Sequence, residues 1–273
     1  MAQLPTITGA QREVHLRWAS DLTQTPTAAG KEQRAIAWIE KWVADRPRLS
    51  LKRDAAGNPH IAAREKTGPG PTGAQRPLYF TAHLDHPAFV VERIIAPAVV
   101  ELSFRGGVMD DYFKDGGVLI WDRDDEPFRA TLTGESTQVE PPFKRYLAEV
   151  AGRGAPSISI GDVAVWDIGS AEVIDGNLHT TACDDLAAAA AALAAMDVLL
   201  AMNTDAALPS LLFTRAEEIG FIGAIAACRH QTMPRAARVI ALENSRSFAD
   251  SPIGGGPIVR VGDRLSVFSP SLT

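Results

Sequence analysis

Four short motifs rich in carboxylates lie just past apolar segments of this chain, and their order constrains the fold more than any other feature. In chain order the motifs are His83-Leu84-Asp85, Asp184-Asp185, Glu217-Glu218 and Glu243. Apolar strands that alternate with helices are typical of a mostly parallel sheet flanked by helices. In such sheets functional groups gather at the carboxyl ends of the strands. The sequence therefore predicts an α/β fold that brings the four motifs together.

The alternation can be followed along both ends of the chain. Helical spacing predicts helices at 9–23, 31–44, 186–202 and 219–229. Short apolar runs predict strands at 49–52, 78–82, 211–214, 237–242 and 257–261, and a further strand that ends at Ile61.

The character of the sequence changes between residues 88 and 172. Short β-type runs are separated there by glycine, aspartate and proline turns, with a possible short helix near 143–150. This pattern predicts a small β-barrel or sandwich inserted into the α/β fold. We therefore expect residues 1–87 and 173–273 to form one α/β domain, and residues 88–172 to form the inserted domain.

Composition narrows the classes of function. Hydrophobic residues make up 46% of the 273 residues, which is enough for a substantial core. The net charge of -6 gives no general attraction for nucleic acid, which we do not expect as a partner. No apolar run approaches the roughly 18 residues of a membrane span, and two cysteines imply no disulfide framework. We expect a cytoplasmic protein with no membrane partner.

The motif His83-Leu84-Asp85 has the composition of a metal ligand and its support. Residues two apart on an extended segment point to the same face, so His83 and Asp85 lie together. A metal-bound imidazole usually donates its second N–H to a carboxylate, and Asp85 is placed for that role. A plain surface turn is the alternative, because His86-Pro87 follows.

The motif Asp184-Asp185 opens an alanine-rich helix. Aspartates at this position commonly cap a helix and complement its dipole. Two adjacent aspartates exceed what a cap requires, so one of them is available to bridge two cations. The residues alone leave both interpretations open.

The two glutamates of the pair Glu217-Glu218 can have different roles. One glutamate binds a metal ion, while its neighbour stays unligated as general base for a metal-bound water. The alternative is a second acidic pair at the start of a helix. Glu243 follows a predicted strand, which is a common position for a charged residue. It is a candidate metal ligand only because it is the fourth such motif in the series.

These motifs resemble those of the dinuclear zinc aminopeptidases of clan MH, most closely the glutamyl/deblocking (tetrahedral) aminopeptidase family. The matching segments lie at 54–58, 81–85, 182–185 and 215–224, and the glutamate pair is the most specific of them. Relatives of the carboxypeptidase/deacylase type carry their extra domain after the glutamate pair, whereas here it comes before. The resemblance implies a zinc exopeptidase-like fold with an inserted barrel.

The resemblance also implies an activity and a role for each residue. It predicts an aminopeptidase that acts on peptide substrates, forms a homo-oligomer and binds two divalent metal ions, zinc or cobalt. The implied roles are first-metal ligands His83 and Glu243, a bridging Asp184 with a cis peptide to Asp185, second-metal ligand Glu218, general base Glu217, and Asp85 orienting His83. A hydroxide that bridges the metals would attack the first peptide carbonyl.

Two departures from the family pattern qualify this hypothesis. Glu243 stands where the family usually has aspartate, and no histidine follows His230, although the family has its last ligand histidine later in the chain. We therefore expect either a fragment or a second metal held only by Asp184, Glu218 and solvent. The alternatives are a related hydrolase of N-acyl amino acids and a non-catalytic member.

Overall fold

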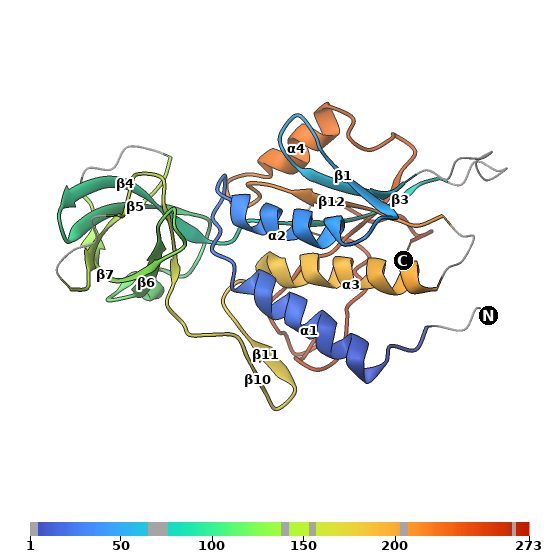
Figure 1. The fold of residues 1–273 in the computed structure, drawn as a ribbon, viewed down its shortest axis with the longest axis horizontal. Helices are drawn as coiled ribbons and strands as arrows, with labels where there is room; N and C mark the ends of the chain where they lie inside the picture. Colours follow the sequence, from blue (N-terminus) through green and yellow to red (C-terminus); the bar gives the residue numbers. More distant parts are fainter. Residues whose placement is uncertain are drawn as a thin grey trace.

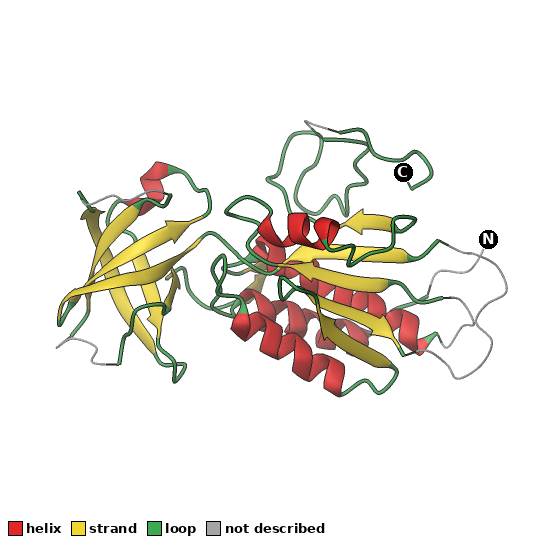
Figure 2. Cartoon of the chain, turned by 90° about the horizontal axis from the view of Figure 1, so that it is seen from above, coloured by secondary structure: helices red, strands yellow, loops and turns green. Residues whose placement is uncertain are grey.

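The computed structural model describes residues 5–64, 76–137, 142–152, 157–202, 207–263 and 266–272. Within these residues an α/β part with a five-stranded sheet lies beside a closed six-stranded barrel (Figures 1 and 2). The chain enters the barrel after the third strand of the α/β part and returns to that part afterwards. The predicted α/β class with an inserted barrel is confirmed.

The sheet of the α/β part has the strand order β1-β2-β12-β3-β13. Its strands are β1 (Leu49–Arg53), β2 (Pro59–Ala63), β3 (Leu78–His83), β12 (Ser210–Thr214) and β13 (Arg238–Ala241). β12 and β13 run parallel to β3, whereas β1 and β2 form an antiparallel hairpin because a short turn joins them. Thr214 pairs with His83, so the segments that follow β3 and β12 leave the sheet at the same edge.

Helices cover both faces of this sheet. The helices are α1 (Gly9–Thr23), α2 (Gln33–Ala44) and α3 (Ala188–Ala201) on one face and α4 (Ile222–Arg229) on the other. Alternating side chains of β12 divide between the faces. Leu211 and Phe213 are buried in the core cluster with α1, α2 and α3, while Leu212 is buried against Ala227 of α4. Each such side chain contributes roughly 1.5–3 kcal/mol by burial.

The barrel closes on itself and therefore has no free strand edge. Its strands, in the order in which they pair, are β4 (Ala88–Ala96), β5 (Val99–Arg105), β8 (Arg145–Val150), β7 (Pro127–Glu135), β6 (Gly117–Trp121) and β9 (Val163–Trp166). Aromatic rings fill its core, and Phe113 stacks on Tyr146 with ring centroids 4.3 Å apart. All six strands fall inside the predicted insertion, whose boundaries at residues 88 and 172 stay a prediction.

Two predicted elements are absent from the described residues, and one observed hairpin was not predicted. The short helix predicted near 143–150 is wrong, because alternate residues of β8 face the barrel core. The strand predicted at 257–261 is also wrong, since these residues form no strand and their side chains are exposed. The hairpin of β10 (Glu172–Ile174) and β11 (Asn177–His179), which projects from the α/β part in Figure 1, was not predicted.

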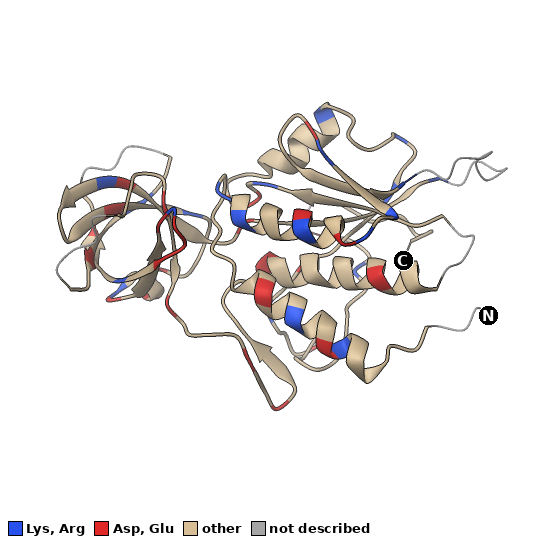
Figure 3. Ribbon diagram, viewed as in Figure 1, with Lys and Arg blue, Asp and Glu red and all other residues tan. Residues whose placement is uncertain are grey.

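Charges of both signs are interspersed along the ribbon in both parts of the molecule (Figure 3). Among the described residues, none of the helices combines the length and apolarity needed to cross a bilayer. The expected absence of nucleic-acid and membrane partners stays a prediction.

Candidate metal centre

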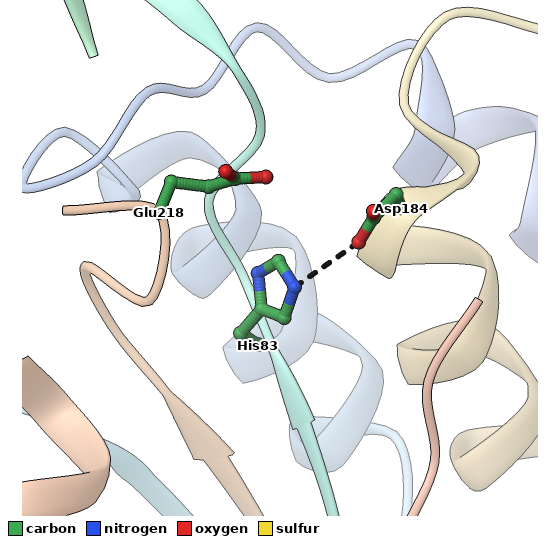
Figure 4. Close-up of side chains that lie close together, drawn as sticks. All are labelled: His83, Asp184 and Glu218. Atoms are coloured by element: carbon green, nitrogen blue, oxygen red, sulfur yellow. Dashed lines mark hydrogen bonds and ion pairs between the residues drawn. The ribbon is translucent and has the colours of Figure 1, made fainter. Parts of the chain in front are cut away.

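The imidazole of His83 lies where the four sequence motifs converge. His83 ends β3, and its side chain is only 4% exposed. Its Nε2 atom is 3.2 Å from Asp184 Oδ1 and 3.8 Å from both Glu217 Oε2 and Glu243 Oε1. Figure 4 shows His83, Asp184 and Glu218 approaching one another from three separate segments. The structure thus brings together residues from all four predicted motifs.

Asp85 contacts both the imidazole and the glutamate pair. His83 Nδ1–H donates to the Asp85 carbonyl oxygen at 3.1 Å and lies 3.5 Å from the Asp85 carboxylate. The two carboxylate oxygens of Asp85 accept the backbone N–H groups of Glu217 and Glu218, each at 2.9 Å. A proton on Nδ1 directs Nε2 toward the carboxylates, where it can carry a second proton or bind a cation.

Two groups of side chains are close enough to share a cation. The groups are His83, Asp184 and Glu218, and His83, Asp185 and Glu243; within each group the donor atoms lie within 4.8 Å of one another. The ligand atoms of one zinc ion, with bonds of about 2 Å, are about 3.3 Å apart in tetrahedral geometry. The observed spacing therefore fits divalent ions after small side-chain movements.

Asp185 belongs to the second group, although the sequence pointed to no ligand role for it. The carboxylate is fully buried, and its Oδ2 atom accepts the His83 backbone N–H at 3.0 Å. Its Oδ1 atom is buried and finds no hydrogen-bond partner within the described part of the chain. The peptide between Asp184 and Asp185 is cis, and neither side chain makes a capping hydrogen bond at the start of α3. The capping alternative is therefore not observed.

The carboxylates of this cluster repel one another. Burial, with the nearby charge of Glu243, raises the pKa of Asp185 to about 8. Burial, with the charge of Asp184, raises the pKa of Glu218 to about 8 as well. Within the described residues no lysine or arginine forms an ion pair with these groups. A divalent cation would supply the missing positive charge.

Burial shifts the pKa values of His83 and Glu217 in opposite directions. Burial lowers the pKa of His83, but hydrogen bonds to Asp184, Asp85 and Glu243 outweigh it and raise the pKa overall. Burial also raises the pKa of Glu217, whose side chain is 23% exposed. Glu217 is thus a partly accessible carboxylate with an increased affinity for protons.

Two further residues hold the backbone of the aspartate pair. His86 Nδ1–H donates to the Asp184 carbonyl oxygen at 2.5 Å, and burial lowers the pKa of His86. Asn244 Nδ2–H donates to the carbonyl oxygen of Cys183. Sequence reasoning missed both, and the position of His86 next to the first motif was the only available signal.

A pocket of about 390 Å³ opens beside Glu218, between the α/β part and the barrel. Its apolar lining includes Phe104, Val108, Phe113, Phe143 and Ile219. The cluster therefore borders on a space that can receive part of a substrate.

Comparison with known proteins connects this geometry to a family. The profile described as M42 glutamyl aminopeptidase matches residues 148–273. Residues 148–273, which we call the M42 segment, are therefore similar to this family. The resemblance inferred from the sequence is thereby confirmed. The M42 segment contains Asp184, Glu217, Glu218 and Glu243, whereas His83 precedes it and joins the cluster through the parallel pairing of β3 with β12.

Solved structures share the fold of the chain at low sequence identity. An aminopeptidase from the archaeon Desulfurococcus kamchatkensis is 18% identical, with a TM-score of 0.67 over 87% of this chain and 65% of that protein. The TET1 peptidase of Pyrococcus horikoshii is 19% identical, with a TM-score of 0.68 over 94% and 78% of the two chains. A Thermotoga maritima protein described as an endoglucanase is 20% identical, with a TM-score of 0.56 over 81% and 64%. No curated protein sequence matches this chain.

Proposed function

We propose that this chain is a metal-dependent aminopeptidase that hydrolyses the N-terminal peptide bond of its substrates. The observation that carries the proposal is the convergence of carboxylates on one buried imidazole, with no lysine or arginine paired to them among the described residues. The M42 segment and the aminopeptidase names of similar structures support this chemistry.

The donor set fits divalent ions. His83, Asp184, Glu218 and Glu243 would hold them, with Asp184 shared between two ions and Asp85 orienting His83. One nitrogen donor with several carboxylate oxygens suits zinc, and cobalt is also compatible. The buried, unpartnered Asp185 Oδ1 atom supports a cation at this place. Bound divalent ions polarise a carbonyl oxygen and lower the pKa of water.

Glu217 is proposed as the general base. Its carboxylate stands 3.8 Å from the centre of the cluster at His83 Nε2, and it is partly exposed to incoming substrate. A raised pKa suits a group that takes a proton from attacking water and returns it to the leaving nitrogen. The backbone N–H of Glu217 is fixed by Asp85, which holds the base in place.

Substrate panels test the proposal. The protein would be stripped with a chelator, reloaded with zinc or cobalt, and assayed on aminoacyl anilides, N-acyl amino acids and carboxymethyl cellulose. We expect the protein to cleave the aminoacyl anilides, which have a free α-amine, and neither of the other two substrates. Turnover of blocked substrates alone would favour the deacylase alternative, and metal binding without any turnover would favour the non-catalytic one.

We also propose that the chain forms a homo-oligomer. The TET1 peptidase of Pyrococcus horikoshii is described as assembling into a tetrahedron or a large octahedral shell. Sedimentation velocity on the purified chain tests this proposal, since a single monomer peak at micromolar concentration would contradict it. The cytoplasmic location inferred from the sequence stays a prediction.

A further inference from the structure

The turn that carries Glu217 and Glu218 has an uncommon backbone. Ala216 and Phe221 have φ angles of 53° and 57°, in the left-handed region that non-glycine residues disfavour. Gly220 also has a positive φ, of 114°. This is why α4 begins at Ile222 and not at residue 219 as predicted. Such a backbone persists only where its surroundings hold it in place.

Side chains from three other segments hold this turn. Each of its first four backbone N–H groups donates to a side-chain oxygen. The pairs are Arg215 with Asn58 at 3.0 Å, Ala216 with Glu32 at 2.9 Å, and Glu217 and Glu218 with Asp85 at 2.9 Å each. Asn58 comes from the turn between β1 and β2, Asp85 follows β3, and Glu32 directly precedes α2.

Among the side chains that hold this turn, Glu32 has no role in the proposed metal centre. Its side chain is fully buried, and both carboxylate oxygens are used. Oε1 accepts the backbone N–H groups of Gly30, at 2.7 Å, and Ala216. Oε2 accepts Nε–H of Arg215 at 2.8 Å and forms an ion pair with Nη2 of the same guanidinium, also at 2.8 Å. Burying a charge is costly unless it is paired and hydrogen-bonded, and here the partners lie in the glutamate turn itself.

We infer that Glu32 is a positioning residue, which keeps the turn in the shape that directs Glu217 and Glu218 into the metal centre. The bond to Ala216 fixes the left-handed residue directly before the glutamates. The forked pairing with Arg215 fixes the residue before that. This inference rests on the proposed function, because it gives Glu32 a role in holding the proposed base and metal ligand.

The variant Glu32→Gln tests the inference with little change in volume. Glutamine keeps one oxygen but places an amide nitrogen, which cannot accept hydrogen bonds, against either Ala216 or Arg215. We expect the affinity for zinc, measured by calorimetry, to fall on the order of 10- to 100-fold, as is typical when a residue that supports metal ligands is changed. We also expect kcat to fall while KM changes little. Arg215→Lys, which keeps the charge but loses the fork, should show a smaller loss of both.

A second substitution separates positioning from mere packing. Glycine adopts a positive φ without the steric penalty of alanine. The double variant Glu32→Gln with Ala216→Gly should therefore regain part of the lost zinc affinity, by several-fold. If Glu32 served only to anchor α2, glycine at position 216 would restore nothing.

The matched control is Glu101→Gln in the barrel. Glu101 is also fully buried and also pairs with arginines, Arg93 and Arg145, but it lies outside the metal centre. Its substitution should lower thermal stability and leave zinc affinity unchanged. Wild-type zinc affinity in a folded Glu32→Gln protein, or no recovery in the double variant, would overturn the inference. A wild-type protein that binds zinc but cleaves no substrate would end the proposed function, while the loss of affinity in Glu32→Gln would still support the role of Glu32.

Discussion

Two buried groups of carboxylates in this molecule have opposite electrostatic surroundings. In the barrel, Glu101 accepts hydrogen bonds from Arg93, Arg145 and Ser136. The bond from Arg93 contributes most to lowering the pKa of Glu101, to about 2. At the metal centre, burial and neighbouring carboxylates raise the pKa values of Asp185 and Glu218 to about 8. The barrel supplies its own counter-charges, whereas no lysine or arginine among the described residues pairs with the carboxylates around His83.

This difference supports a structural role for Glu101 and a functional role for the cluster around His83. A carboxylate whose partners are all in the protein, such as Glu101, gains stability by being ionised. A carboxylate cluster without such partners costs stability and persists where a ligand or reaction requires it. Glu32 resembles Glu101 because an arginine of the protein, Arg215, pairs with it. It also belongs to the candidate site, because Arg215 lies in the turn that carries Glu217 and Glu218.

The largest effect is expected for Glu217→Gln. If Glu217 is the base, its loss should lower kcat by about 10²- to 10⁴-fold, because glutamine cannot accept the proton. Zinc affinity should change little, since Glu217 is not a proposed ligand. Steady-state kinetics on an aminoacyl anilide, together with calorimetry, would measure both. A variant with wild-type kcat would show that the base is a different group.

The next effect concerns zinc and pH. Asp185 and Glu218 have raised pKa values in the folded state. Between about pH 4 and pH 8 the metal-free folded protein therefore binds more protons than the unfolded chain. Its stability falls as pH rises through that range. Zinc replaces the protons and should stabilise the fold by about 3 kcal/mol at a hundred times its Kd near pH 8, and by less near pH 5. Thermal unfolding of metal-free and zinc-loaded protein across this range provides the measurement. A zinc effect that is larger at the lower pH would contradict the account.

Glu101 should respond to acid in the opposite sense. Its pKa is lowered in the folded state, so its stabilisation is present above about pH 4.5 and is lost as pH falls toward about 2. Glu101→Gln should remove about 2 kcal/mol of stability at neutral pH, because it breaks bonds between charged groups at a fully buried position. Chemical denaturation at pH 7 measures this loss. Unchanged stability would mean that the arginines around Glu101 find other partners at no cost.

The smallest effect is expected for Glu218→Gln in the metal-free protein. Removing a charge that burial disfavours should raise stability near pH 9, on the order of 1 kcal/mol after allowing for solvent screening. The same variant should bind zinc more weakly. Denaturation of the metal-free variant and wild type at this pH makes the comparison. A loss of stability would show that the Glu218 carboxylate is already compensated by the protein.

The sequence predicted the fold where local pattern and long-range pairing agree. The apolar runs of β3 and β12 are buried on both faces, so their sequence shows both the strand and the place where functional groups follow. The pattern failed for β8, where a mixture of aromatic, aliphatic and charged residues is compatible with helix or strand. It also failed at 257–261, where β-branched residues stay exposed.

The sequence indicated the candidate ligands and one supporting residue, Asp85, but none of the other supports. The candidate ligands and base can be recognised in the sequence by residue type and by their positions after apolar runs. They are His83, Asp184, Glu217, Glu218 and Glu243. The contacts of Glu32, His86 and Asn244 depend on which backbone groups the folded chain brings near them. Such partners lie up to 184 residues away in sequence, and no local pattern indicates them.

Metal content distinguishes a dinuclear metal centre from a carboxylate cluster that binds no metal. Wild type and His83→Ala would be saturated with zinc, freed of excess metal by gel filtration, and analysed by plasma emission. We expect more than one zinc ion per wild-type chain, approaching the two ions of a dinuclear centre, and well under one in His83→Ala. Well under one ion per wild-type chain, or equal content in both proteins, would contradict this expectation.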